Sequence, residues 1–232
     1  MTAIGERDSS TQAHRLYGRS RGKALRAGQE RLLAEALPLF STTPEALAAG
    51  RAFSGSPDEV WLEVGFGAGE HLLEQARANP NVGIVGCEPF LNGVVAALAG
   101  LQRESLSNVR LRHGDAQAVI DAVPNGFFSR VFIHYPDPWP KRRHHKRRLV
   151  ASSFVDALAR VMAAGAELRF ATDIDDYAGW TLVRFLASPD FRWTATRPDH
   201  WRRPWSDWRP TRYEAKARSE GRGSVYLTFV RL

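Results

Sequence analysis

Residues 60–70 read VWLEVGFGAGE, and this stretch decides the fold class. A short apolar run leads directly into a loop that contains Gly65, Gly67 and Gly69, and residues 70–78 then have the apolar spacing of an amphipathic helix. Glycines between a strand and a helix allow a tight turn and a close approach of the backbone to a ligand. The stretch therefore predicts a strand, a ligand-binding loop and a helix at the start of an α/β domain.

The same alternation of apolar runs and helical spacing continues to the end of the chain. Six further strands are predicted, at residues 82–88, 109–113, 130–135, 166–172, 191–196 and 225–230. Helices are predicted between them at residues 90–102, 146–163 and 177–187. The strands are apolar throughout, as in a parallel sheet that helices cover on both faces. The sequence therefore predicts an α/β fold built on a parallel sheet.

The first 58 residues do not follow this pattern. Residues 1–30 are polar and basic, which is typical of an arm that is either flexible or binds phosphate groups. Residues 31–49 contain short helical stretches, and residues 50–58 (GRAFSGSPD) have the composition of a linker. We therefore expect a partly flexible basic arm and linker over residues 1–58 and one domain over residues 59–232.

The composition narrows the class of partner. The 232 residues include 32 Lys and Arg against 25 Asp and Glu, a net charge of +7 that favours a polyanionic partner such as a nucleic acid. Cys87 is the single cysteine, which excludes an intrachain disulfide and a CxxC metal site. No apolar run reaches the ~18 residues of a membrane span, and the N-terminus lacks the apolar core of a secretion signal. We expect a cytoplasmic protein that binds neither a membrane nor a metal.

Acidic residues stand at the ends of the first four predicted strands: Glu63, Glu88, Asp115 and Asp137. The carboxyl ends of parallel strands meet at one edge of the sheet, where ligands bind. A ring of carboxylates suits a cationic sulfonium cofactor and repels a pyrophosphate. In addition, Glu70 stands where a dinucleotide fingerprint has its third glycine. These features favour S-adenosylmethionine, with a nicotinamide-dependent dehydrogenase as a more distant alternative.

A basic segment follows the fourth predicted strand, where residues 134–148 read HYPDPWPKRRHHKRR. Pro136 and Pro138 stiffen the backbone on both sides of Asp137. Basic runs are usually solvated surface, but this one adjoins the predicted ligand edge, which favours contact with a nucleic-acid backbone. Residues 201–209 then interleave tryptophans with arginines, a pattern typical of base stacking and phosphate binding.

Together, these motifs resemble those of the bacterial tRNA (guanine-N7-)-methyltransferase family. The matching motifs are LEVGFGAGEH (62–71), GCEP (86–89), HGDA (113–116), PDPWPKRRHHKRR (136–148), ATD (171–173) and TRYE (211–214). The resemblance implies the α/β, Rossmann-like fold of class I methyltransferases, with a mostly parallel seven-stranded sheet whose last strand is antiparallel and with helices on both faces. It also implies methyl transfer from S-adenosylmethionine to N7 of a guanine in tRNA, namely guanine 46 of the variable loop.

The resemblance further implies roles for individual residues. The implied cofactor contacts, together with the loop glycines, are Glu63, Gly65, Gly67, Gly69, Glu88, Asp115 and Asp137. Asp137 is also the implied catalytic residue. The implied contacts with guanine or tRNA are Lys141, Asp173, Thr211, Arg212, Tyr213 and Glu214. The implied RNA-contacting stretch comprises Arg143, His144, His145, Lys146, Arg147 and Arg148.

The chemistry of guanine fits these roles. N7 carries a free lone pair and can attack a sulfonium methyl group without a strong base. Asp137 would stabilise the positive charge that develops on the ring, and Asp173 and Glu214 would accept hydrogen bonds from the guanine N1–H and 2-amino groups. Two alternatives stay open: an enzyme that methylates an exocyclic amine, since PDPW resembles the Asp-Pro-Pro-aromatic motif of that class, and an inactive RNA-binding protein on the same fold. The protein would be a monomer or a homodimer.

Overall fold

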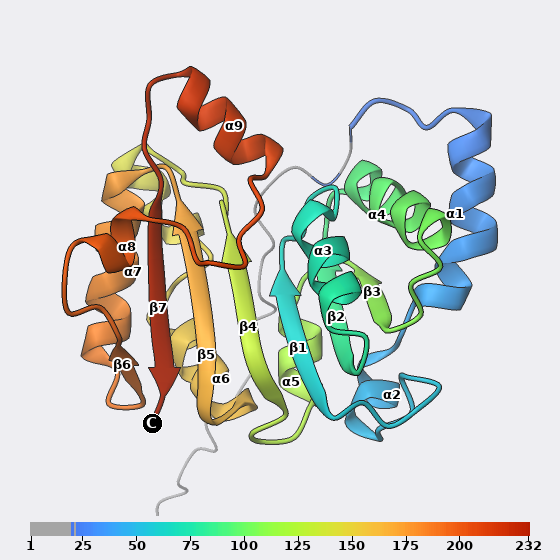
Figure 1. The fold of residues 1–232 in the computed structure, drawn as a ribbon, viewed down its shortest axis with the longest axis horizontal. Helices are drawn as coiled ribbons and strands as arrows, with labels where there is room; N and C mark the ends of the chain where they lie inside the picture. Colours follow the sequence, from blue (N-terminus) through green and yellow to red (C-terminus); the bar gives the residue numbers. More distant parts are fainter. Residues whose placement is uncertain (1–19, 21) are drawn as a thin grey trace, which may run out of the picture.

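The strands of this protein form one seven-stranded sheet (Figure 1). The computed structural model describes Ser20 and residues 22–232 of the chain. The strands are β1 (Glu59–Val64), β2 (Val82–Glu88), β3 (Val109–His113), β4 (Phe128–His134), β5 (Met162–Thr172), β6 (Phe191–Trp193) and β7 (Val225–Arg231). Their order is β3-β2-β1-β4-β5-β7-β6, and β7 is antiparallel to both of its neighbours. The predicted sheet, mostly parallel with an antiparallel last strand, is confirmed.

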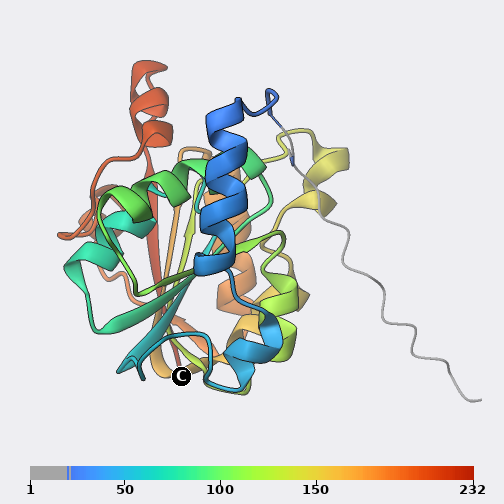
Figure 2. The ribbon, with the colours of Figure 1, turned by 90° about the vertical axis from the view of Figure 1, so that its right-hand side faces the viewer.

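Helices cover both faces of this sheet (Figure 2). The α-helices are α1 (Ala27–Phe40), α2 (Pro44–Ala48), α3 (Glu70–Ala78), α4 (Leu91–Arg103), α5 (Gln117–Ala122), α6 (Ser152–Val161), α7 (Asp175–Ala187), α8 (Asp199–Arg202) and α9 (Arg212–Ser219), and a 3-10 helix, η1, spans Arg142–Arg147. None of the helices in the described part of the chain combines the length and the apolar character that a membrane crossing requires.

The two faces of the sheet carry separate hydrophobic cores. Successive side chains of a strand point to opposite faces, so Trp61 packs in the core beneath α1, α3 and α4. Its neighbour Leu62, and Val64 two residues later, pack in the core beneath α2, α5, α6 and α7. This alternation places Glu63 on the same face of the sheet as Trp61, beneath α3.

The N-terminal region contributes two helices to these layers. Helix α1 packs against α4 and buries Ala36, and α2 buries Leu47 in the core beneath α5. The described part of the predicted arm and linker is therefore packed against the sheet from Ala27 to Ala48. Most of the basic arm lies outside the described residues, at positions 1–19 and 21.

The helix predicted over residues 146–163 is wrong at both ends, since α6 ends at Val161 and β5 begins at Met162. Residues 142–147 form η1, the next four residues are not helical, and α6 begins only at Ser152. The non-helical stretch is held by a tertiary contact, because the indole N–H of Trp180 in α7 donates to the carbonyl of Val150 at 2.6 Å. The sixth strand is also shorter than predicted and ends at Trp193.

Candidate active site

A cavity of about 330 Å³ lies at the carboxyl ends of β1, β2 and β4. Its walls are formed by Val64, Gly65, Gly67, residues 87–90, residues 114–116, residues 134–137, Trp139, Arg147, Leu149 and Tyr213. Three of the four predicted strand-end acids, Glu88, Asp115 and Asp137, therefore meet in one cavity. This is the edge of the sheet at which an open α/β fold binds its ligands.

The glycine loop and Glu88 form one wall as a unit. Glu88 is almost fully buried, and its two carboxylate oxygens accept the backbone N–H groups of Gly67 at 2.7 Å and Phe90 at 2.8 Å. Burial raises the pKa of the Glu88 carboxyl, and the two N–H donors oppose this shift. Gly65 and Gly67 have φ of 76° and 59°, in the left-handed region that favours glycine. The loop is thus held against the cavity by a fixed carboxylate.

Asp115 and Asp137 occupy other parts of the wall. One oxygen of Asp115 accepts the backbone N–H of Gln117 at 2.6 Å. Asp137 lies between Tyr135 and Trp139, which have φ of 48° and 45°, unusual values for residues with side chains. Although part of Asp137 is exposed, the surrounding loop withdraws its carboxyl from water and raises its pKa. Asp137 therefore lies on the rim of the cavity, in a loop whose backbone is left-handed on both sides of it.

Glu63 differs from its predicted position. It does not line the cavity but lies on the α3 face of the sheet, almost fully buried, with a carboxylate oxygen 2.8 Å from Nδ1 of His71. The ring of His134 packs edge-on against His71, with centroids 4.4 Å apart, and burial lowers the pKa of His134 well below its usual range. Glu63 lies inside β1, one residue before its end, so strand alternation turns it away from the cavity.

The TRYE segment forms the start of α9 beside the cavity. Thr211 caps the helix, its hydroxyl accepting the N–H of Glu214 at 3.3 Å. Tyr213 lines the cavity and lies nearly parallel to the ring of Tyr135, with 6.3 Å between centroids. Arg212 extends toward Glu70 at the start of α3, with 3.6 Å between the charged atoms. The cap thus directs Arg212 and Tyr213 toward the glycine loop.

Glu214 and Asp173 are engaged with the protein itself. Glu214 is fully buried and accepts the indole N–H of Trp208 at 2.6 Å and the hydroxyl of Tyr226 at 3.0 Å. Arg218 also pairs with it. Asp173 is half-buried and pairs with Arg222 at 2.8 Å. In this arrangement Glu214 anchors α9 instead of facing a base, which differs from the prediction that it reads guanine.

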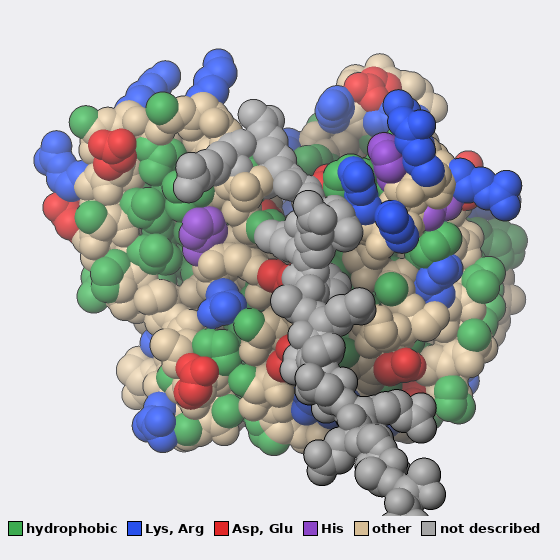
Figure 3. Space-filling model, turned by 180° about the vertical axis from the view of Figure 1, so that it is seen from behind, with side chains coloured by type: hydrophobic (Ala, Val, Ile, Leu, Met, Phe, Trp, Pro, Cys, Tyr) green, Lys and Arg blue, Asp and Glu red, His purple; other side chains and the backbone are tan. Residues whose placement is uncertain are grey.

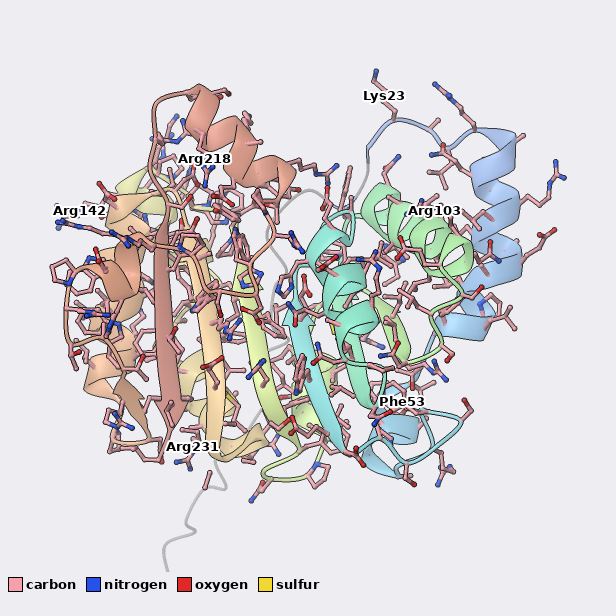
Figure 4. All side chains as sticks on the ribbon, in the orientation of Figure 1. Lys23, Phe53, Arg103, Arg142, Arg218 and Arg231 are labelled. Carbon is pink, nitrogen blue, oxygen red and sulfur yellow. The ribbon has the colours of Figure 1, made fainter. Side chains whose placement is uncertain are left out.

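The basic segment divides into exposed and buried parts. Lys141, Arg143 and Lys146 are exposed, and Arg147 lies over the ring of Trp139 at 4.9 Å. From behind the molecule, Figure 3 shows Lys and Arg side chains gathered at the upper right with histidines among them. In Figure 4, Arg142 extends outward from this end of the molecule. A positive surface therefore adjoins the cavity.

Arg148 has a different role from the predicted RNA contact. Its side chain is fully buried and pairs with Asp176 of α7. It also donates to the carbonyl of Pro138 at 2.9 Å and lies over the rings of Tyr177 and Trp180. Arg148 thus fastens the loop that carries Asp137 to α7. His144 and His145 are half-buried beside it.

Sequence reasoning missed several aromatic residues of the site. Tyr135 was visible only as a neighbour of Pro136, and its position on the cavity wall follows from the end of β4. Trp208 belongs to the tryptophan- and arginine-rich stretch, but it is buried, donates to Glu214 and packs against His134. The only sequence signal for this contact was that Trp208 stands six residues before Glu214. The composition of the stretch does not distinguish a buried tryptophan from an exposed one.

The known proteins that this chain resembles are methyltransferases. Residues 57–227 match the profile of a family described as "Putative methyltransferase". A tRNA (guanine-N(7)-)-methyltransferase of Ruegeria sp. (strain TM1040) is 47% identical over 99% of this chain and 92% of the relative. One from Azorhizobium caulinodans is 46% identical over 100% of both chains. Among solved structures, the 16S rRNA (adenine(1408)-N(1))-methyltransferase from Catenulisporales acidiphilia shares the fold, with a TM-score of 0.52, 19% identity, and coverage of 83% of this chain and 94% of its own.

Proposed function

Because this chain belongs to the family of bacterial tRNA (guanine-N(7)-)-methyltransferases, we propose that its cavity binds S-adenosylmethionine and that its basic surface brings guanine 46 of a tRNA to Asp137. The observation that carries the proposal is the meeting of Glu88, Asp115 and Asp137 in one cavity beside an exposed basic segment. The family relationship makes the reaction the transfer of a methyl group to N7 of a guanine in tRNA.

The residues on the cavity wall fit this cofactor. A Cβ atom added at Gly65 or Gly114 would meet no atom within 4 Å, so both glycines leave open space on the wall. Each oxygen of Glu88 accepts one backbone N–H, and a carboxylate oxygen has a second lone pair, which suits the two hydroxyls of a ribose. We assign the ribose to Glu88, the adenine side to Asp115, and the positively charged methionyl end to the neighbourhood of Asp137.

The chemical step needs orientation more than proton transfer. Bound S-adenosylmethionine supplies an electrophilic methyl group. Guanine N7 already carries its lone pair, so no residue has to remove a proton from the attacking atom. Asp137 provides a negative charge for the ring that becomes positive, and the stiff Pro136–Pro138 backbone fixes that charge before the reaction. Tyr135 and Tyr213 offer flat surfaces near the rim on which a displaced base can stack.

The raised pKa of Asp137 predicts a pH dependence. Withdrawal from water raises the pKa above the usual 3.8, so acidification removes the carboxylate at a higher pH than for an exposed aspartate. We expect the single-turnover rate, measured from about pH 5 to pH 8 at saturating cofactor and tRNA, to fall on the acid side. Saturation matters because Glu88, whose pKa is also raised, would affect cofactor affinity. Asp137→Asn should lose this acid limb; an identical limb in that variant would contradict the assignment.

The exposed part of the basic segment predicts a change in salt dependence. Replacing Arg143 and Lys146 together by alanine should weaken tRNA binding and reduce the slope of log affinity against log salt by roughly two, about one per lost phosphate contact. A charge-matched control replaces Arg51 and Arg192, two exposed residues that do not line the cavity. Phe53 and Arg231, which are near them in the chain and in the sheet, lie at the end of the molecule opposite α9 in Figure 4. Filter binding at several salt concentrations measures both. Equal slopes in the two double variants would show that the basic segment is solvated surface only.

The site of methylation is tested directly with methyl-labelled S-adenosylmethionine and unmodified tRNA transcripts. Cleavage specific for 7-methylguanosine should release the label at guanine 46, and a transcript with adenine at that position should accept none. Label on an exocyclic amine would favour the alternative enzyme class. Tight tRNA binding without transfer would identify an inactive RNA-binding protein on this fold.

A further inference from the structure

Arg148 lies between the loop that carries Asp137 and the first turn of α7, and its side chain is fully buried. The motif that contains it implies an RNA contact, but a guanidinium without exposed surface does not meet a phosphate backbone. We propose that Arg148 is a positioning residue for methyl transfer, which holds Asp137 in place through the carbonyl of Pro138. The proposal rests on the function proposed above, because it assumes that Asp137 acts on the guanine.

The loop around Asp137 has few groups with which to hold itself. Residues 136–140 read PDPWP, and none of the three prolines has a backbone N–H to donate. Nε of Arg148 instead donates to the carbonyl oxygen of Pro138 at 2.9 Å. Because the proline ring already fixes φ, a fixed carbonyl leaves Pro138 little freedom, and the residue before a proline is restricted as well. The bond from Arg148 therefore acts on the backbone directly beside Asp137.

The other side of the Arg148 guanidinium is bound to α7. It pairs with Asp176 and lies over the rings of Tyr177 and Trp180, at 4.9 Å and 5.0 Å from their centroids. Tyr177 is fully buried and packs edge-on against Phe170 of β5, with 5.5 Å between centroids. A guanidinium carries its donors in one rigid plane, so a single side chain sets both contacts. Arg148 thus connects the loop to the core of the sheet.

This contact is expected to matter more for geometry than for stability. Removing a guanidinium from water is unfavourable, and Asp176 offsets this only in part, because 65% of the Asp176 side chain is exposed. A buried ion pair is therefore a weak source of net stability. A displacement of about 1 Å at a reacting group, in contrast, can slow a reaction by ~10²-fold. Loss of the Arg148 contacts should therefore reduce the rate of transfer more than it destabilises the fold.

The first test compares Arg148→Met and Arg148→Lys in the full-length chain. Methionine keeps an unbranched apolar stem, and lysine keeps the charge without the planar fork that joins Pro138 to Asp176. Single-turnover methyl transfer, at saturating cofactor and tRNA, should slow by roughly 10- to 100-fold in both variants. The affinity for tRNA and its dependence on salt should stay as in the wild type, because a buried side chain makes no phosphate contact.

The control for this test is Arg192→Met, which changes an exposed arginine of β6 and should alter neither the rate nor the affinity. An RNA contact gives a different result. In that case Arg148→Met would lower the slope of log affinity against log salt by about one, and Arg148→Lys would restore the slope. This outcome would overturn the proposal.

A double-mutant cycle separates positioning of Asp137 from a general structural effect. If Arg148 acts through Asp137, Arg148→Met should slow transfer by less than about 2-fold in a chain that already carries Asp137→Ala. The same substitution should slow the otherwise unchanged chain by the full factor. Equal slowing in both backgrounds would show that the two residues act independently, and the proposal would then be wrong.

Folding is controlled with Asp176→Asn, which leaves Arg148 in place and changes an exposed side chain. This variant should slow transfer by a smaller factor than Arg148→Met and keep the tRNA affinity of the wild type. Circular dichroism and the thermal midpoint identify any variant that fails to fold. Wild-type rates in folded Arg148→Lys and Asp176→Asn would refute the role of Arg148 alone, whereas absence of transfer by the wild type would refute the proposed function itself.

Discussion

Replacing Asp137 by alanine is expected to slow methyl transfer by roughly 10²- to 10³-fold, a loss of about 3–4 kcal/mol of transition-state stabilisation. The guanine ring gains a positive charge during the reaction, and Asp137 is an acidic residue on the cavity rim held between two unusual backbone turns. The variant removes a charge whose orientation was fixed before the reaction. Because tRNA affinity comes mainly from phosphate contacts, it should change little.

Single-turnover rates at saturating cofactor and tRNA measure this effect, and filter binding measures the affinity. The control is Asp156→Ala, which removes an exposed carboxylate on α6 and should leave both quantities unchanged. A wild-type rate in Asp137→Ala would defeat the proposed role. A parallel loss of rate and tRNA affinity would indicate that the loop had lost its structure, and circular dichroism would detect that case.

Replacing Gly93 by alanine is expected to weaken cofactor binding by at least ~100-fold. Gly93 lies on α4, where a Cβ atom would come within 2.2 Å of the carbonyl oxygen of Gly67 and 3.0 Å of its carbonyl carbon. Both are backbone atoms, and the Gly67 N–H is held by Glu88, so the clash must move the glycine loop or the helix. Helix propensity alone predicts the opposite, since alanine favours a helix over glycine by about 1 kcal/mol.

Gly179 provides the matched control, because it lies in α7 and a Cβ atom there meets nothing within 4 Å. Gly179→Ala should raise the free energy of unfolding by roughly 0.5–1 kcal/mol and leave cofactor binding unchanged. Isothermal titration with S-adenosylmethionine and thermal unfolding separate the two variants. Wild-type cofactor affinity in Gly93→Ala would show that α4 can withdraw from the loop at little cost.

The sequence allowed the first strand–loop–helix unit to be predicted closely. The helix predicted at residues 70–78 has those bounds in the structure, because its apolar spacing and the glycine loop act locally. The start of α6 could not be predicted in the same way. The non-helical stretch before it is held by Trp180, thirty residues beyond Val150 in the chain, and helical spacing in residues 146–151 carries no sign of that partner.

The candidate site was predicted best where residues are at or beyond the ends of strands. Glu88 is the last residue of β2, and Asp115 and Asp137 follow β3 and β4, so they reach the cavity. Glu63 lies inside β1, where the face of the sheet to which a side chain points decides whether it reaches the cavity. The burial of Glu214 and Arg148 depends on partners from distant elements, Tyr226 and Asp176, which a motif does not reveal.

The two left-handed residues beside Asp137 have a consequence for how this chain can evolve. Tyr135 and Trp139 each hold a backbone conformation that costs a residue with a side chain of order 1–3 kcal/mol. Glycine at either position would release that energy and loosen the loop. Selection for heat resistance would therefore favour changes at these positions, and selection for rapid turnover would oppose them. Among heat-adapted descendants that keep their turnover, we expect added stability to arise outside this loop.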